Sequence, residues 1–301
     1  MLLTKSRIFL TTDFSKIILG TAQFGLNYGI NNSSGKISKN KIFKILDYAI
    51  DSGINTLDTA PSYGNSEEII GEYLEFNPGK SIRVITKISL SNDSLEIQLM
   101  NSLNKLKIQK VNTLLFHSIN LYEKFHDELP FFIDNFKGKY FDEIGVSIYW
   151  NDQVDRIIND EKIDRIQLPF NLLDNSSLRK SIILKLKSNN KKVDARSVFL
   201  QGLFFKPIEN LSNDFEFLKK ELLILNDLTK KYKIPIESLA LNYVLSKKFI
   251  DRTIIGIDSL KQLKSNIKNI NSGVIKELFT KIEFIRIQNP KALNPSLWPK
   301  Y

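Results

Sequence analysis

Cysteine is absent from the 301 residues of this sequence, and histidine occurs only twice, as His117 and His126. Without cysteine the chain can form no disulfide, thiolate zinc site or iron–sulfur cluster, and it has no cysteine nucleophile. Two histidines leave little besides carboxylates to bind a transition metal. We therefore expect no metal site, and a chemistry that rests on other side chains.

Long apolar runs are also missing. No stretch of about 18 apolar residues, the length that crosses a bilayer, occurs anywhere in the chain. The N-terminal segment carries Lys5, Arg7 and Asp13 among its apolar residues, unlike a secretory signal. With 42% hydrophobic and 25% charged residues, the composition is that of a folded protein, and we expect it to be soluble and cytoplasmic with no membrane partner.

Basic residues outnumber acidic ones by 43 to 33, for a formal net charge of +10. Such an excess can indicate nucleic-acid binding, but a nucleic-acid interface needs clustered cations. Here the lysines are scattered beside acids, and the densest basic run, 189–192, is short. We expect no nucleic-acid partner and at most a mild bias toward a small anionic ligand. No feature of the sequence indicates an oligomeric state.

Short apolar, β-branched runs alternate with amphipathic segments along the chain. Near-continuous apolarity is typical of strands that are covered on both faces. Eight such runs predict strands at 16–20, 55–60, 82–88, 111–118, 143–149, 164–170, 192–199 and 253–257.

The segments between these runs have the apolar period of helices. Ser38 is the expected N-cap of the first helix, Gly53 its end, and Ser66 the cap of the second. Further helices are predicted at 94–106, 122–136, 153–159, 177–189, 214–232, 235–246 and 259–270, and one beyond the repeat at 274–287.

Eight strand–helix units in about 250 residues predict a single (β/α)8 TIM barrel. The alternative is an open, doubly wound sheet with an appended domain. No linker divides the chain, which favours one domain over 1–301, with a core at about 16–270 and an extra C-terminal helix and tail at 271–301. In such a barrel the chemistry lies at the C-terminal ends of the strands.

Four polar residues fall at or just beyond the ends of consecutive predicted strands: Asp58, Tyr63, Lys87 and His117. Singly, each has an ordinary structural explanation, although a lysine on a buried strand is costly unless it is paired. Together they suit acid–base chemistry, with Tyr63 as proton donor, Lys87 lowering its pKa and Asp58 pairing with the lysine. With His117 holding a substrate oxygen, the fitting reaction is protonation of the alkoxide that forms when a carbonyl accepts hydride.

The segments LGTAQFG, DTAPSYGNSEEIIGEYL, VITKI and LLFHS resemble, in order and spacing, the aldo-keto reductase superfamily over about 17–270. The resemblance implies that Asp58, Tyr63, Lys87 and His117 are a complete catalytic tetrad with Tyr63 as general acid. It also implies an NAD(P)H-dependent oxidoreductase that reduces an aldehyde or ketone to an alcohol.

No G-x-G-x-x-G motif occurs, so a Rossmann site is unsupported. The resemblance instead implies NADPH extended across the barrel mouth. It assigns cofactor contacts to Gly20, Thr21, Ala22, Ser147, Gln167, Arg196, Gly256, Ser259, Gln262 and Asn266.

Two positions depart from the family pattern. Arg196 stands where an aromatic residue commonly stacks on the nicotinamide; it could stack there too, bind an anionic group, or pair with Asp194. Asp258 stands where small or neutral residues are usual, and its carboxylate would repel a 2′-phosphate and favour NADH. Lys261 and Lys264 could offset that repulsion. We expect NADPH, with NADH as the alternative.

The substrate is expected to be a small carbonyl compound. Candidate pocket walls are Phe24, Tyr28, Trp150, Phe199 and Trp298. The segments GLNYGINNSSGK and ARSVFLQGLF are similar to those of bacterial aldo-keto reductases encoded beside surface-polysaccharide or nucleotide-sugar genes, which implies a sugar-like carbonyl at most. Two other functions stay open: a cofactor-binding regulatory subunit with little turnover, and a non-redox anion-binding barrel enzyme. The latter is disfavoured because no glycine-rich phosphate loop follows the seventh strand.

Overall fold

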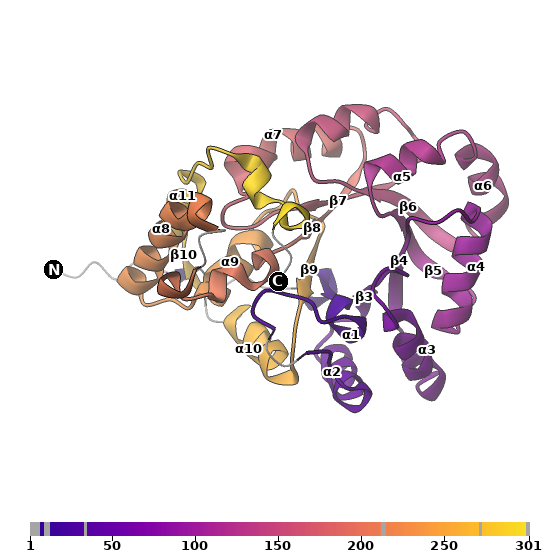
Figure 1. Cartoon of the computed structure of the whole chain (residues 1–301), viewed down its shortest axis with the longest axis horizontal. Helices are drawn as coiled ribbons and strands as arrows, with labels where there is room; N and C mark the ends of the chain where they lie inside the picture. Colours follow the sequence, from indigo (N-terminus) through magenta and orange to yellow (C-terminus); the bar gives the residue numbers. More distant parts are fainter. Residues whose placement is uncertain (1–6, 9–12, 33–34, 212–214, 271–272, 299–301) are drawn as a thin grey trace.

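Eight parallel strands close into a barrel in chain order, and helices surround it (Figure 1). The computed structural model describes residues 7–8, 13–32, 35–211, 215–270 and 273–298. The closed barrel confirms the predicted (β/α)8 fold and excludes the open doubly wound sheet. Its strands are β2 (Ile17–Gly20), β3 (Thr56–Asp58), β4 (Arg83–Ile88), β5 (Val111–Phe116), β6 (Phe141–Ser147), β7 (Arg165–Pro169), β8 (Lys192–Arg196) and β9 (Arg252–Gly256).

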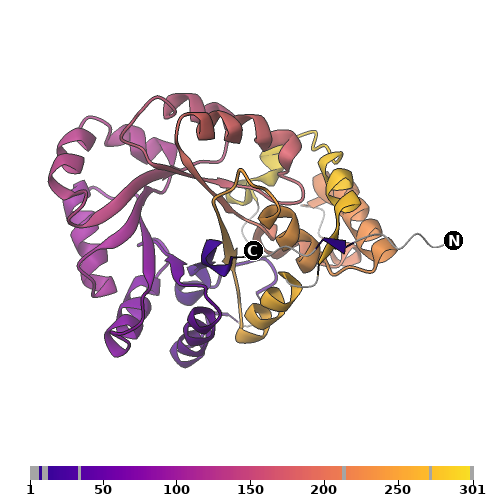
Figure 2. The same ribbon diagram turned by 180° about the vertical axis from the view of Figure 1, so that it is seen from behind.

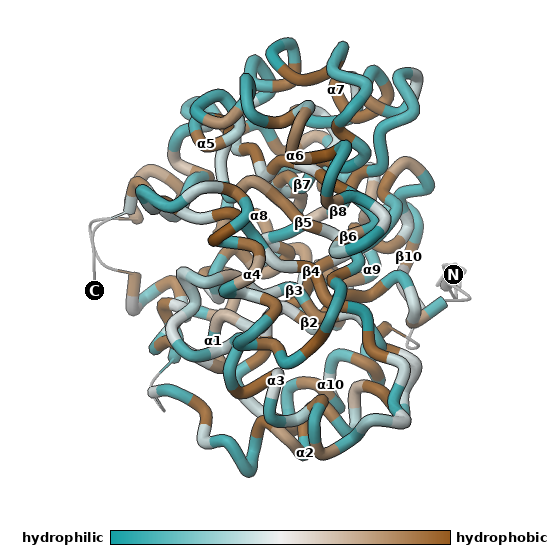
Figure 3. Tube along the Cα trace, turned by 90° about the vertical axis from the view of Figure 1, so that its right-hand side faces the viewer, coloured by the Kyte–Doolittle hydropathy of each residue, from teal (hydrophilic) through white to brown (hydrophobic). Residues whose placement is uncertain are grey.

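The helices cover the outer face of these strands, and apolar residues concentrate along the strands between them (Figure 3). The α-helices are α1 (Ala22–Gly25), α2 (Lys39–Asp51), α3 (Ser66–Phe76), α4 (Leu95–Leu106), α5 (Ile119–Lys124), α6 (Leu129–Phe136), α7 (Ser176–Ser188), α8 (Glu216–Tyr232), α9 (Ile236–Leu245), α10 (Leu260–Ile270) and α11 (Lys276–Glu283). Short 3-10 helices are η1 (Phe14–Lys16), η2 (Asn151–Arg156), η3 (Leu200–Phe205), η4 (Ile208–Asn210), η6 (Pro290–Leu293) and η7 (Pro295–Leu297). None of the helices in the described ranges is long and apolar enough to cross a bilayer.

Three of the helices predicted within the barrel repeat differ from the structure. The segment 122–136 forms two helices, α5 and α6, because Pro130 lacks a backbone N–H and is tolerated only in a first turn. The segment 153–159 forms the 3-10 helix η2 instead of an α-helix. Ser66 is the first residue of α3, and Asn65 is its N-cap. The predicted helix start at residue 214 lies outside the described residues.

The C-terminal helix is shorter than predicted from 274–287. It is α11, preceded by β10 (Val274–Ile275), which pairs antiparallel with β1 (Arg7–Ile8). Figure 2 shows this small sheet beside α11. Two-residue strands carry no periodic signal, so the sequence could not predict the pairing. Residues 271–272 and 299–301 of the predicted tail lie outside the described part of the chain.

The barrel interior is layered, because successive strand side chains point to opposite faces. Its middle layer is a small apolar cluster, separate from the main core, of Ile18, Ile85, Leu115 and Ile254. Two residues further along the same strands, at their C-terminal ends, come Gly20, Lys87, His117 and Gly256. One alternation rule therefore places candidate site residues from four strands at the same end of the barrel.

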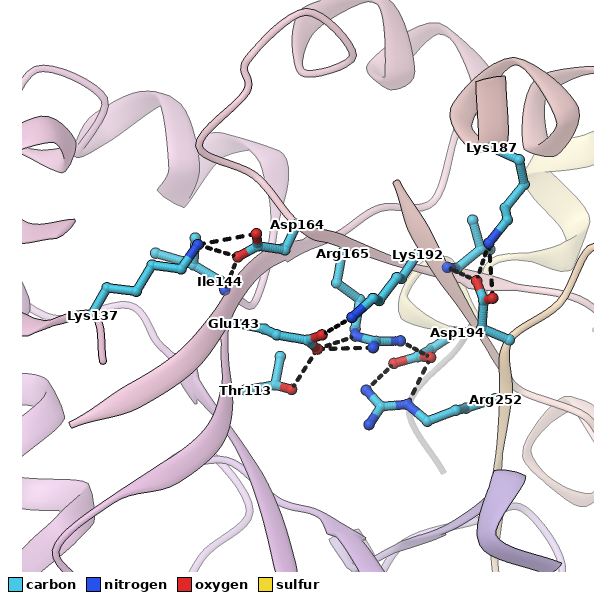
Figure 4. A network of polar contacts seen from close by, with 12 residues as sticks. Thr113, Lys137, Glu143, Ile144, Asp164, Arg165, Lys187, Lys192, Asp194 and Arg252 are labelled. Carbon is cyan, nitrogen blue, oxygen red and sulfur yellow. Dashed lines mark hydrogen bonds and ion pairs between the residues drawn. The ribbon is translucent and has the colours of Figure 1, made fainter. Parts of the chain in front are cut away.

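An ion-pair network fills the opposite end of the interior (Figure 4). Asp194, which is fully buried, receives Arg165 Nη1 at 2.7 Å and Arg252 Nη2 at 2.9 Å. Glu143 is bound by Arg165 Nη2 at 2.8 Å and by Lys192. Because each of these charges has a partner of opposite sign, their burial is tolerated.

Candidate active site

A cavity of about 720 Å³ opens at the C-terminal ends of the strands. Twelve of the fourteen residues predicted for the site line it: Gly20, Thr21, Ala22, Asp58, Tyr63, His117, Ser147, Gln167, Arg196, Gly256, Gln262 and Asn266. Lys87 lies behind this wall, where it contacts Asp58 and Tyr63. Ser259 does not line the cavity; its hydroxyl accepts the backbone N–H of Gln262 at 3.2 Å and caps α10.

Lys87 connects the catalytic candidates. It is 1% exposed, and its ammonium donates to Asp58 Oδ1 at 2.6 Å, to the Thr59 carbonyl at 2.8 Å and to Tyr63 Oη at 3.3 Å. These acceptors use all three protons of an ammonium group. The charge that looked costly on a buried strand is therefore paired, and it is aimed at the phenol.

Asp58 is held from both sides. Its Oδ2 accepts a hydrogen bond from Gln167 Nε2 at 2.9 Å, while its Oδ1 accepts from Lys87. Gln167 was predicted only as a cofactor contact. The structure also gives it the task of fixing the carboxylate that orients the lysine.

The protonation states of Tyr63 and Lys87 follow from burial and from their contact. Burial raises the pKa of the Tyr63 phenol, and Lys87 offsets only part of that rise. Lys87 does lower the pKa of Tyr63, as predicted, but burial has the larger effect, so this pKa is raised overall. Burial disfavours the charged form of Lys87, but Asp58 and Tyr63 outweigh it and raise the pKa of the lysine. At neutral pH the site thus holds a protonated phenol beside an ammonium.

His117 completes the group. Its ring lies edge-on to that of Tyr63, with the ring centroids 5.8 Å apart. Burial, together with the charge of Lys87, lowers the pKa of His117 to about 4, so the imidazole is neutral near pH 7. Ser62 Oγ lies 3.2 Å from His117 Nδ1. When this hydroxyl donates to Nδ1, Nε2 carries the proton and can donate to a substrate oxygen. Ser62 was not among the residues predicted from the sequence.

Two glycines bring Tyr63 to this position. A Cβ on Gly25 would lie 1.7 Å from the Tyr63 carbonyl oxygen, and one on Gly64 would lie 2.5 Å from the Gly25 carbonyl oxygen. The Tyr63 loop and α1 therefore pack backbone against backbone. Ser66 Oγ, hydrogen bonded to the Thr21 carbonyl at 3.1 Å, ties the start of α3 to the same place.

At the far end the cavity runs along the start of α10. There the backbone N–H of Asp258 donates to Gln262 Oε1 at 2.6 Å, and Gln262 Nε2 donates to Asp258 Oδ2 at 3.2 Å. Asp258 Oδ1 is buried and has no hydrogen-bond partner among the described residues. Glu237 lines the cavity too. The ammonium of Lys264 lies 5.1 Å from the centroid of the Tyr48 ring, outside the cavity wall.

Arg196 reaches the cavity from the end of β8. Its guanidinium carbon lies 4.0 Å from the centroid of the Tyr149 ring, and its Nη2 donates to the Ile148 carbonyl at 3.1 Å. The alternative that Arg196 pairs with Asp194 is wrong. Asp194 lies in the network at the other end of the barrel, two residues back along the same strand.

Two loops that are distant in sequence meet over the cavity. Gln201 Nε2 donates to Tyr28 Oη at 2.8 Å, and Asn31 Nδ2 donates to the Gly202 carbonyl at 2.6 Å. Leu200, Gln201 and Gly202 all have positive φ, of 48°, 52° and 92°. Only the glycine marks such a turn in a sequence, because left-handed backbone is unfavourable for leucine and glutamine.

The residues predicted as pocket walls divide into two groups. Tyr28 and Phe199 line the cavity, whereas Phe24, Trp150 and Trp298 do not. Trp298 instead packs edge-on against Phe215, with the ring centroids 5.0 Å apart.

The mouth of the barrel thus brings together a tyrosine, a lysine, an aspartate and a histidine. The model of the Aldo/keto reductase family matches residues 16–286. The chain belongs to this family and is therefore an oxidoreductase.

Three comparisons place it among relatives. It is 24% identical over 286 residues to the uncharacterized oxidoreductase YqkF of Bacillus subtilis, covering 86% of this chain and 92% of that one. It is 23% identical over 266 residues to the NADH-specific methylglyoxal reductase of Escherichia coli, covering 73% and 79%. The crystal structure of PA4992 from Pseudomonas aeruginosa, which is assigned to the aldo-keto reductases, has the same fold, with a TM-score of 0.60, 17% identity, and 85% and 90% of the two chains covered.

Proposed function

We propose that this protein is a nicotinamide-dependent reductase that converts an aldehyde or ketone to the alcohol, with Tyr63 as the proton donor. The observation that carries the proposal is the half-buried, protonated phenol of Tyr63, 3.3 Å from the Lys87 ammonium and edge-on to neutral His117.

The residues of the cavity fit a nicotinamide cofactor. A Cβ on Gly20 would lie 3.2 Å from Ile254 Cγ2, and one on Gly256 would lie 2.8 Å from Gln23 Nε2, so a larger residue at either position would press against a side chain that lines the cavity. The unpartnered Asp258 Oδ1 offers an acceptor for a ligand hydroxyl. Residues that would hold the cofactor are Gly20, Thr21, Ala22, Ser147, Gln167, Gly256, Gln262 and Asn266.

When bound, the cofactor supplies the hydride. Tyr63 Oη donates its proton to the carbonyl oxygen as negative charge develops there. The Lys87 ammonium then stabilises the phenolate, and Asp58 keeps the lysine in place. His117 Nε2–H donates a hydrogen bond to the same oxygen and so orients the carbonyl.

The resemblance favours NADPH, but the charges at the far end of the cavity support NADH. The charged residues that line this end are both acids, Asp258 and Glu237, and the Lys264 ammonium lies over Tyr48 instead. Carboxylates repel a 2′-phosphate and accept hydrogen bonds from a free 2′-hydroxyl. We propose NADH as the preferred cofactor. The NADH-specific relative in Escherichia coli is consistent with this choice.

Two measurements test the proposal. Titration with NADH and NADPH, followed by cofactor fluorescence, measures binding, and a screen of aldehydes, ketoses and keto-sugars measures turnover. Binding without turnover of any carbonyl would favour a regulatory subunit. Failure to bind either cofactor would favour a non-redox barrel enzyme.

The variant Tyr63→Phe tests the proton donor. Removing one hydroxyl should lower kcat about 10²- to 10⁴-fold, the range typical of general acids. The dissociation constant for the cofactor should stay within about threefold, because only the acid is lost. Nearly full activity in this variant would exclude Tyr63 as the donor.

A further inference from the structure

Arg196 carries a charge that no described carboxylate neutralises. Three other arginines that are largely buried each have an acid partner: Arg165 and Arg252 bind Asp194, and Arg179 binds Asp174 at 2.5 Å. Within the described part of the chain, the groups hydrogen bonded to Arg196 are neutral: the Ile148 carbonyl at 3.1 Å and Ser197 Oγ at 3.2 Å. Burying half of a guanidinium without a counter-ion costs free energy. Its position in the cavity wall therefore indicates a ligand of opposite charge.

The guanidinium is held in place with donors to spare. Tyr149 covers one of its faces, with 4.0 Å between the guanidinium carbon and the ring centroid. The two hydrogen bonds to Ile148 and Ser197 use two of the five N–H groups that an arginine offers. Three donors therefore remain on a planar group that suits bidentate binding of a carboxylate or phosphate.

The reacting groups lie within range of this charge. Arg196 is among the charges that act on the phenol of Tyr63 and on the imidazole of His117, and it lines the same cavity as both. An anion bound to Arg196 would therefore lie in the part of the cavity where the carbonyl is reduced, away from the acidic end at Asp258.

A neutral donor stands on the same wall. The Tyr28 hydroxyl accepts a hydrogen bond from Gln201 Nε2 at 2.8 Å and keeps its own proton to donate. Burial raises the pKa of Tyr28, so this proton is retained. The loop that carries Gln201 holds left-handed φ values at Leu200 and Gln201, a conformation that costs free energy and is typical of functional sites.

We propose that the substrate carries an acidic group, a carboxylate or a phosphate, which Arg196 binds while the carbonyl contacts Tyr63 and His117. This inference rests on the proposed reductase function. It defines the substrate class as anionic aldehydes or ketones.

Matched substrate pairs test the proposal. Succinic semialdehyde against butyraldehyde isolates a carboxylate, and glyceraldehyde 3-phosphate against glyceraldehyde isolates a phosphate. The wild-type enzyme should have the higher kcat/KM for the acidic member of at least one pair, and which pair it is distinguishes the two anions. Arg196→Gln should raise KM for that acidic member about 10- to 100-fold, the loss expected for charge-assisted hydrogen bonds. KM for its neutral partner should change less than about threefold.

Two variants control for folding and for net charge. Arg196→Lys keeps the charge and should recover part of the loss. Arg83→Gln removes one positive charge at the opposite end of the barrel, at the first residue of β4, and should leave the preference unchanged. Equal losses for the acidic and neutral members, or a weaker affinity for NADH with no change in preference, would overturn the proposal and make Arg196 a cofactor contact.

Binding of the alcohol products tests the anion site without turnover. Calorimetry should show that 4-hydroxybutyrate or glycerol 3-phosphate binds the wild-type enzyme and that Arg196→Gln abolishes this binding. An absence of binding by both compounds would overturn the proposal. Absence of any carbonyl turnover, with anion binding intact, would instead contradict the reductase function.

Discussion

The acid–base properties of this site come from a few side chains in a buried setting. Tyr63 has a raised pKa, Lys87 stays charged because Asp58 outweighs the effect of burial, and His117 has a pKa of about 4. None of the three changes protonation near pH 7. The donor is therefore ready for reduction, whereas the alcohol oxidation that runs in reverse needs the phenolate.

This arrangement predicts a flat pH profile for kcat of carbonyl reduction between about pH 5 and 9, since the His117 transition lies below this range and those of Tyr63 and Lys87 lie above it. Steady-state rates at saturating cofactor and substrate would measure it. A limb near pH 6.5 that disappears in His117→Asn would contradict the assignment of a neutral imidazole.

The same shift has a consequence for folding. The pKa of His117 falls from 6.5 to about 4 on folding, so its contribution to stability is complete above pH 6.5 and is lost as the pH falls through 4. Denaturant titrations between pH 7 and 4 should therefore show a smaller acid-dependent loss for His117→Asn than for the wild type.

Cofactor choice depends on Asp258. Replacing it by serine removes the charge nearest to the expected 2′-phosphate, so Asp258→Ser should raise the affinity for NADPH relative to NADH about tenfold. Fluorescence titrations with both cofactors measure the ratio. Asp127→Ser, at a fully exposed side chain that does not line the cavity, serves as the control. An unchanged ratio would dismiss the role of this carboxylate.

The position of the proton donor Tyr63 depends on how its loop packs against α1, as well as on the side chains around it. The loop from β3 to α3 packs directly on α1, and the contact requires glycine at Gly25 and Gly64. Glycine is therefore needed at these two positions so that the tyrosine loop and α1 can pack closely, and this packing determines where Tyr63 lies.

Gly25→Ala should disturb this contact. Its Cβ would lie 1.7 Å from the Tyr63 carbonyl oxygen, and since the clash involves backbone, the tyrosine loop must move. We expect a loss of kcat of about 100-fold, as for a misplacement of about 1 Å, and a destabilisation of about 1–3 kcal/mol. Gly79→Ala is the matched control, because nothing lies within 4 Å of its Cβ. Similar activity and melting temperatures for the two variants would contradict this account.

The elements also show what periodicity can and cannot predict. All eight barrel strands were predicted, because their apolar runs reflect local burial on two faces. The division into α5 and α6 at Pro130 and the left-handed turn at Leu200–Gly202 were not. Apolar period alone does not reveal a break within a helical pattern, and only long-range contacts stabilise an unfavourable φ.

The whole barrel separates function from stability along its axis. The cavity occupies one end, the Ile18 cluster the middle, and the Asp194 network the other end. Mutations in the network should therefore affect folding and leave catalysis intact.

Asp194→Asn tests this separation. It leaves Arg165 and Arg252 without their shared carboxylate, and breaking a buried pair in this way costs about 3–5 kcal/mol. Denaturant unfolding should show this loss, while kcat for a neutral aldehyde stays within about threefold. Asp155→Asn, which breaks an exposed bridge to Lys185, should cost less than about 1 kcal/mol. A large drop in kcat at full stability would contradict the separation.

The sequence by itself determined the eight strands, their alternation and the four residues at their C-terminal ends, because these depend on local burial and on a period of two residues. Closure of the barrel decided the rest. It brought β7 and β9 beside β8, so that Arg165 and Arg252 bind Asp194, while Arg196 faces the cavity with no carboxylate of the described residues as its counter-ion. It also desolvated Tyr63 enough to outweigh the effect of Lys87 on the pKa of the phenol. Partner choice and desolvation depend on residues distant in sequence, so they appear only when the chain is folded.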